Sequence, residues 1–167
     1  MSQFADIQPT ALADNLFQRI GSDWMLITAG QRGAYNTMTA SWGGAGVLWG
    51  KNVAFVFVRP SRYTYEFMEK ESAFSMSFFD EKYRDALKLC GAKSGRDIDK
   101  AAATGLTPCF DGAAPYFEQA RLVVVCRKLY AQDLDPAQLQ APPLAGFYKD
   151  GDFHRMYVGE ITQILQR

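Results

Sequence analysis

Hydroxyl and amide side chains crowd into one stretch of this chain, Asn36-Thr37-Met38-Thr39-Ala40-Ser41-Trp42. The stretch follows a glycine-containing turn at Gln31–Tyr35 and is predicted to form a hairpin with a first strand at Trp24–Ala29. Successive side chains of a strand point to opposite faces, so Thr37, Thr39 and Ser41 would share one polar face. That face could line a pocket, although ordinary surface hydroxyls would produce the same pattern.

A second polar stretch, Arg59-Pro60-Ser61-Arg62-Tyr63-Thr64, follows an apolar strand predicted at Val53–Val58. Pro60 ends that strand because proline has no N–H for the ladder, and a helix is predicted at Thr64–Lys70. Backbone N–H groups at a helix N-terminus, the helix dipole and nearby cations or hydroxyls together stabilise a phosphate. The simpler alternative is that Ser61 caps the helix and that both arginines are solvated.

A third stretch, Lys93-Ser94-Gly95-Arg96-Asp97-Ile98-Asp99-Lys100, repeats this arrangement at the start of a helix predicted over Ser94–Ala103. It is a second candidate phosphate clamp, and the alternative is a row of exposed ion pairs worth about a few tenths of a kcal/mol each. Two such stretches in one small chain favour a single phosphate-bearing ligand. Because the first polar stretch suits the rim of a flat heterocycle, we interpret that ligand as flavin mononucleotide (FMN).

The remaining pattern predicts a β-rich protein. Hydrophobic residues make up 48% of the 167 residues and aromatic residues 14%, mostly in short alternating runs typical of strands. Further predicted elements are a helix at Ala11–Ile20, a strand at Ala73–Phe79, a helix at Lys82–Leu89, a loop or short helical turn at Pro136–Pro143, and strand-like segments at Tyr116–Gln132 and Phe153–Leu165. We therefore predict a mainly β fold, an antiparallel β-barrel with peripheral helices, in one domain over residues 1–167.

Composition and charge exclude several classes of function. The formal net charge is zero and the cations are scattered, which argues against nucleic-acid binding. No stretch reaches the length of a membrane span, and Met1–Thr10 lacks the apolar run of a secretory signal, so we expect a soluble, cytoplasmic protein. The 3 cysteines are far apart and the chain has 1 histidine, so we predict neither a disulfide framework nor a metal site.

Other motifs for nucleotide binding or catalysis do not fit. Gly91-Ala92-Lys93-Ser94 lacks the glycines of a P-loop, and Gly43-Gly44-Ala45-Gly46 lacks the spacing of a dinucleotide fingerprint. These last glycines would let the backbone approach a ligand or a partner strand closely, or would mark a bulge. His154 has no serine or cysteine paired with it at readable spacing, so no catalytic residue is predicted.

A fourth stretch near the C-terminus is His154-Arg155-Met156-Tyr157-Val158-Gly159-Glu160-Ile161. With these four stretches in this order, the chain resembles the flavin reductase-like family of FMN-binding split barrels, which includes flavoredoxin. The resemblance covers most of the chain. It implies a six- or seven-stranded antiparallel split barrel that forms a homodimer, with FMN bound near the subunit interface.

The resemblance also implies roles for individual residues. Asn36, Thr37, Met38, Thr39, Ala40, Ser41 and Trp42 would lie along the isoalloxazine ring of FMN, and His154 would lie near the flavin. Arg62, Tyr63 and Thr64 would hold the phosphate with Ser94 and Lys100, and Arg59 and Ser61 complete the set of cofactor-binding residues.

The function implied by this resemblance is that of an FMN-dependent oxidoreductase that takes electrons from NADH or NADPH and reduces flavin. One alternative is an electron carrier of the flavoredoxin type, which exchanges electrons with a redox protein partner without its own NAD(P)H turnover. Another is a non-redox barrel that binds a phosphorylated small molecule.

Overall fold

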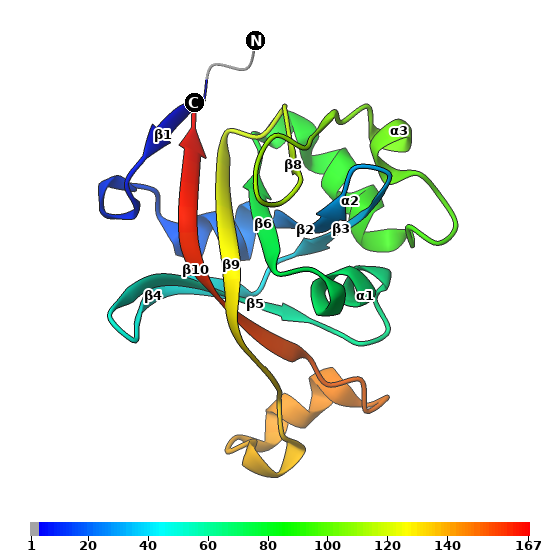
Figure 1. Cartoon of the computed structure of the whole chain (residues 1–167). Helices are drawn as coiled ribbons and strands as arrows, with labels where there is room; N and C mark the ends of the chain where they lie inside the picture. Colours follow the sequence, from blue (N-terminus) through cyan, green and yellow to red (C-terminus); the bar gives the residue numbers. More distant parts are fainter. Residues whose placement is uncertain (1–3) are drawn as a thin grey trace.

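The computed structural model describes residues 4–167, and within that range an eight-stranded antiparallel sheet forms the body of the protein (Figure 1). Its strands follow the order β3-β2-β6-β9-β10-β5-β4, and β1 pairs with β10. In chain order they are β1 (Ala5–Ile7), β2 (Met25–Gln31), β3 (Ala34–Ala40), β4 (Gly43–Leu48), β5 (Lys51–Val58), β6 (Ala73–Phe78), β9 (Leu122–Asp133) and β10 (Arg155–Gln166). The predicted mainly β fold is confirmed.

The strand β10 joins the two halves of the sheet. It pairs with β5 over its first half, with β9 along most of its length, and with β1 over Ile164–Gln166. Its register with β9 shifts at two places, the first between Val158 and Gly159, and such bulges bend a strand. A Cβ on Gly159 would lie 2.6 Å from the Cys126 Cβ and 2.8 Å from the Phe74 ring, so only glycine fits there.

Apolar side chains cover both faces of the sheet, in two separate clusters. In β2, Met25 and Ile27 enter a cluster shared with β5, β6 and β10, whereas Leu26 enters a second cluster with Leu87 and Phe117. The alternation follows from the two-residue period of a strand. Because burying one such side chain stabilises a fold by roughly 1.5–3 kcal/mol, these clusters hold the sheet together.

Three helices accompany the sheet in the described part of the chain: α1 (Tyr63–Lys70), α2 (Arg84–Ala92) and α3 (Lys100–Thr104). The helices α1 and α2 pack against β2 and β3, and α3 packs against α2 (Figure 1). A small two-stranded sheet pairs β7 (Pro108–Cys109) with β8 (Tyr116–Phe117). The fold also contains a π-helical segment and short 3-10 turns at Pro9–Ala11, Glu81–Tyr83, Pro136–Gln138 and Pro142–Tyr148. The helices therefore flank β3, the strand of the first polar stretch.

The helix predicted over Ala11–Ile20 is correct only in its second half, because helical structure runs over residues 16–23. The chain forms a 3-10 turn at Pro9–Ala11 and a π-helix at Gln18–Asp23. The Asn15 side chain accepts the N–H of Gln18 at 3.3 Å, in the manner of a residue at the start of a helix. Helical structure therefore begins only after Asn15, and the preceding apolar residues are not on one helical face.

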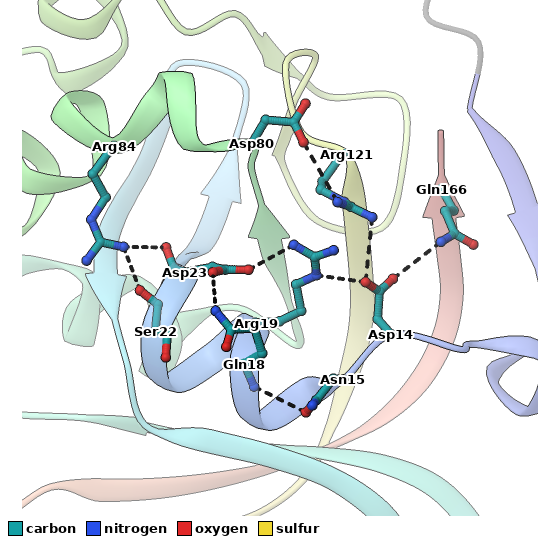
Figure 2. Close-up of polar contacts among 10 residues, drawn as sticks. All are labelled: Asp14, Asn15, Gln18, Arg19, Ser22, Asp23, Asp80, Arg84, Arg121 and Gln166. Atoms are coloured by element: carbon teal, nitrogen blue, oxygen red, sulfur yellow. Dashed lines mark hydrogen bonds and ion pairs between the residues drawn. The ribbon is translucent and has the colours of Figure 1, made fainter.

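A polar network fixes this N-terminal segment to the sheet (Figure 2). Arg19 pairs with Asp14 at 2.7 Å and with Asp23 at 2.8 Å. Arg121, which directly precedes β9, lies 3.6 Å from Asp14 and 3.8 Å from Asp80. These charged side chains thus attach the segment to the start of β9 and to the residues that follow β6.

The glycines at Gly43–Gly46 form an unpredicted strand. They begin β4, which pairs with β5 in a continuous register without a bulge. Gly43 has a φ of +156°, and a Cβ there would lie 2.7 Å from the Phe55 carbonyl oxygen. Of the alternatives for these glycines, which were approach to a ligand, approach to a partner strand and a bulge, the structure shows approach to a partner strand. With β4 and β1 included, the sheet has eight strands rather than the expected six or seven.

Two other predicted elements are shorter than expected. The helix predicted over Ser94–Ala103 reduces to α3, because the Asp99 carboxylate accepts the N–H of Ala102 at 3.1 Å and starts the helix there. The segment Tyr116–Gln132 divides into β8 and β9, because the chain turns between them, where the Ala120 N–H donates to the Phe117 carbonyl.

Candidate functional site

A cleft of about 600 Å³ lies where the two ends of the sheet approach each other. One wall comes from the end of β3 and the residues after it, and the opposite wall comes from the end of β5 and the loop before α1. Because β3 and β5 are separated by four other strands in the sheet order, the sheet must curl to bring them together. The volume falls in the range of roughly 300–1,000 Å³ typical of small-molecule sites.

The cleft contains many of the residues predicted to bind a cofactor. Those that line it are Met38, Thr39, Ala40, Ser41, Trp42, Arg59, Ser61, Arg62 and His154. The structure thus brings the first and second polar stretches together with the only histidine of the chain.

The other predicted residues do not line the cleft: Asn36, Thr37, Tyr63, Thr64, Ser94 and Lys100. Asn36 donates to the Thr64 hydroxyl at 2.9 Å, which ties β3 to α1. The Thr37 hydroxyl lies 2.8 Å from that of Thr28 on the neighbouring strand β2. These buried polar groups support the wall of the cleft from behind.

The third polar stretch packs against this support. A Cβ on Gly95 would lie 1.9 Å from Asn36 Oδ1 and 3.2 Å from the Tyr63 ring, so the loop needs glycine at that point. The Ser94 hydroxyl accepts the N–H of Arg96 within its own turn at 3.1 Å. The loop therefore touches β3 and α1 without entering the cleft, and the phosphate contact of Ser94 stays a prediction.

Lys100 is buried behind β3, with 7% of its surface exposed. Its Nζ donates to the carbonyl oxygens of Thr37 and Cys90, each at 2.7 Å. Burial lowers the pKa of Lys100 to about 8; Cys90 opposes this change and Arg62 adds to it. Its donors are used to join β3 to α2, so its predicted contact with a phosphate also stays a prediction.

Cations and hydroxyls gather at one end of the cleft. Arg59 donates to the carbonyl oxygens of Asp152 (3.0 Å) and Phe147 (2.8 Å), and Arg62 donates to that of Gly91 (3.1 Å). Burial lowers the pKa of Arg62, the positive charge of Arg59 adds to this, and Asp152 opposes it. This end can therefore stabilise an anion.

Aromatic rings line the same cleft and reach these cations, since the Arg59 guanidinium lies 5.0 Å from the centre of the Tyr148 ring. Trp42 lies with its ring centre 5.2 Å from Phe147 and 5.1 Å from His154. The Tyr148 hydroxyl lies 2.8 Å from His154 Nδ1. The pKa of His154 is lowered to about 4, mainly by burial and also by the nearby charge of Arg59, while Asp152 opposes both, so the imidazole is neutral near pH 7.

The third wall of the cleft was not predicted. It comes from the segment between β9 and β10, through Gly146, Phe147, Lys149, Asp150 and Asp152. The sequence indicated only a loop or short turn at Pro136–Pro143, ahead of this wall. The aromatic residues that follow the prolines were the one signal that this segment packs against something.

The chemistry of the cleft suits a flat heterocycle joined to a phosphate. Trp42 and Phe57 offer aromatic surface, and Arg59, Ser61 and Arg62 offer cations and a hydroxyl in the same cleft. Ser41 lines the cleft, and its hydroxyl makes no hydrogen bond to any other residue between 4 and 167. The residues present therefore fit a flavin nucleotide in size and in donor chemistry.

Comparison with protein families agrees with this cleft. The model of the flavin reductase like domain matches residues 17–167. The chain belongs to the flavin reductase-like family. A search of curated proteins finds no match for this family member.

Solved structures share the fold of this flavin reductase-like protein. Flavoredoxin from Methanosarcina acetivorans is 22% identical with a TM-score of 0.67, over 87% of this chain and 68% of that chain. An FMN-binding protein from Thermus thermophilus, with bound 1-cyclohex-2-enone, is 18% identical with a TM-score of 0.69, over 97% and 80%. An NADH:FAD oxidoreductase from Streptomyces globisporus, in complex with NAD and FAD fragments, is 14% identical with a TM-score of 0.64, over 87% and 74%. These similarities confirm the fold.

Two further features concern the described residues of this family member. No helix within residues 4–167 is long and apolar enough to cross a membrane. Over the same range, no group of three or more histidine, cysteine, aspartate or glutamate side chains is arranged to hold a metal ion.

Proposed function

We propose that the chain is an FMN-binding flavoprotein oxidoreductase that takes electrons from NADH or NADPH. The observation that carries this proposal is the cleft itself, in which aromatic rings and arginine side chains line one space of about 600 Å³. Membership of the flavin reductase-like family supports a flavin as the occupant.

The arrangement of the cleft suggests which residues hold each part of FMN. The isoalloxazine ring would lie against Thr39–Trp42, where the ring of Trp42 and the hydroxyl of Ser41 are available. The phosphate would lie at Arg59, Ser61 and Arg62. A bound flavin supplies the hydride-accepting chemistry at its N5 atom, so the chain needs no acid or base of its own for that step.

The protein's own contribution is to bind, orient and exclude water. His154 is neutral near pH 7 and 8% exposed, so it presents an uncharged ring atom beside Trp42. Tyr148 contacts Nδ1 and therefore orients that ring. Such a neutral hydrogen-bonding group can contact a flavin ring without adding charge beside Trp42.

We also propose that the protein is a homodimer. Phe17, which is 92% exposed, lines a cleft together with Trp42, and Val47, which is 74% exposed, lies on β4. A second cleft of about 670 Å³, lined by Phe17, Trp42 and the start of β4, adjoins the first. Apolar surface of this kind, next to an edge strand without an outer partner among residues 4–167, favours contact with a second protein surface.

Flavin titration tests the cleft assignment. We expect FMN fluorescence to be quenched on binding, and Trp42→Ala to weaken the binding of both FMN and riboflavin, because both carry the ring. Arg62→Ala should weaken FMN alone, by about tenfold or more, since one charge-assisted hydrogen bond is worth roughly 1.5–3 kcal/mol. Arg96→Ala is the matched control, because Arg96 is exposed, pairs with Glu66 and does not line the cleft.

Equal losses of FMN and riboflavin in Arg62→Ala would contradict the placement of the phosphate. Oxidation of NADH and of NADPH with added flavin then separates a reductase from a carrier: no turnover with either nucleotide would leave the flavoredoxin-like electron carrier. No binding of any flavin would favour a non-redox protein that binds another phosphorylated molecule.

A further inference from the structure

The carboxylate of Asp152 already occupies the hydroxyl-bearing corner of the cleft. The Ser61 N–H donates to Asp152 Oδ1 at 3.3 Å, and the Ser61 hydroxyl donates to Oδ2. The two residues are 91 positions apart in sequence, so this is a contact between two walls of the cleft and not a local turn. One internal anion therefore uses the donors that Ser61 would offer to a phosphate.

The charges around Asp152 agree with this position. Arg59 donates to the Asp152 backbone carbonyl at 3.0 Å, so the guanidinium lies beside the same residue. The negative charge of Asp152 also acts on Arg62 and His154, where it opposes the effect of burial on both pKa values. Asp152 thus faces the cations of the cleft from the segment that forms its third wall.

A bound phosphate and this carboxylate would compete. Two anions that accept from the same hydroxyl and N–H cannot both do so, and they also repel each other. Binding of FMN therefore requires the carboxylate to leave Ser61. Riboflavin has no phosphate and leaves the contact between Asp152 and Ser61 in place.

We propose that Asp152 determines the preference of the cleft between flavins with and without a phosphate, an inference that rests on the proposed function. Its carboxylate lowers the affinity for FMN relative to riboflavin by holding the Ser61 donors. The effect belongs to one residue of the third wall, which the sequence motifs of the family resemblance do not include. It makes Asp152 a specificity-determining residue.

The test compares the affinities of FMN and riboflavin in the full chain, read from the quenching of flavin fluorescence. Asp152→Asn should tighten FMN by about tenfold and change riboflavin by less than about twofold, since one charge-assisted hydrogen bond corresponds to about one factor of ten. Asp150→Asn is the matched control. It removes the same charge from the same wall, but Asp150 lies 3.8 Å from Arg59 and does not contact Ser61.

A second variant shows whether the effect passes through Ser61. In the Ser61→Ala background, Asp152→Asn should have a smaller effect on FMN than in the unmodified chain, because the competing hydroxyl is gone while the backbone N–H and the charge repulsion remain. Melting temperatures check that each variant is folded, and Asp152→Ser replaces Asp152→Asn if the latter is not.

The possible results separate the two proposals. Equal tightening by Asp152→Asn and Asp150→Asn, or an equal effect on FMN and riboflavin, overturns the specificity role and leaves the flavin site standing. Weaker FMN binding in Asp152→Asn also overturns the role. Failure of every variant and of the unmodified chain to bind either flavin overturns the proposed function, and this inference with it.

Discussion

Replacing Lys100 with methionine tests whether this residue supports β3 or binds a phosphate. Methionine keeps much of the apolar volume of the side chain but removes the ammonium. The change breaks two hydrogen bonds of 2.7 Å, to the carbonyl oxygens of Thr37 and Cys90. Both acceptors are then left facing an apolar side chain in a buried place.

The size of the effect follows from these contacts. Hydrogen bonds from a charged group are worth roughly 1.5–3 kcal/mol each, and an unpaired buried carbonyl costs about 1–3 kcal/mol. The cost of burying the ammonium, which also lowers the pKa of Lys100 to about 8, offsets part of this sum. We expect a net loss of roughly 2–4 kcal/mol and a fall in melting temperature of roughly 5–15 °C, at about 2–4 °C per kcal/mol for a chain of this size.

The assay combines urea or thermal unfolding with flavin titration. Lys93→Met is the control, because Lys93 is an exposed lysine in the adjoining loop. We expect Lys100→Met to leave the ratio of FMN to riboflavin affinity unchanged within about twofold, since Lys100 does not line the cleft. A selective loss of FMN affinity would refute this reasoning and restore the phosphate role that the family resemblance implies.

The pH dependence gives a second check on Lys100. Its pKa in the folded protein is about 8, below the ordinary value of 10.5. The unfolded chain therefore binds more protons between these values, so the folded protein gains stability relative to Lys100→Met as the pH rises from about 8 to 10.5. A constant difference across that window would mean that the amine is not desolvated.

Two further predictions concern His154 and Gly159. His154 is the only histidine, so its NMR signals are unambiguous, and they should titrate with a midpoint near pH 4. Because this pKa lies below the ordinary value of 6.5, the folded protein should gain stability as the pH rises from about 4 to 6.5. This gain should be absent in His154→Asn. A midpoint near 6.5 would mean that the ring is exposed. Gly159→Ala should lower the free energy of unfolding by about 1–3 kcal/mol, because its Cβ would meet Cys126 and Phe74. Gly46→Ala is the control, since a Cβ there meets nothing within 4 Å. Similar melting temperatures for these two variants would contradict the close packing around Gly159.

Local patterns were sufficient to predict most of the strands. The apolar run Val53–Val58 and the alternation in Ala73–Phe79 match β5 and β6 closely. Strands that are buried on one or both faces have a recognisable pattern of hydrophobic residues. The helix predicted at Thr64–Lys70 matches α1 within one residue. The strand β4 was not predicted, because its glycine-rich sequence has no such hydrophobic pattern.

The cleft could be predicted only in part. The residues at Thr39–Trp42 and Arg59–Arg62 were recognised from their chemistry, and closure of the sheet brings them together. Asp152 could not be found this way, because its partner Ser61 is 91 positions away in sequence and becomes a neighbour only when the segment between β9 and β10 packs on the cleft. The contact between Tyr148 and His154 spans six positions in an irregular segment, where no helix or strand period predicts which side chains meet. Lys100 was chosen for the chemistry of a phosphate ligand; in the structure it donates to two backbone carbonyls, and its contact with a phosphate stays a prediction.

The position of β10 in the chain has a consequence for biosynthesis. It follows every other strand in sequence, yet it pairs with β1, β5 and β9. Until β10 has been made, the edges of β5 and β9 that pair with it have unpaired backbone N–H and C=O groups. A nascent chain that stalls on the ribosome before Arg155 would therefore expose unpaired strand edges, which favour aggregation.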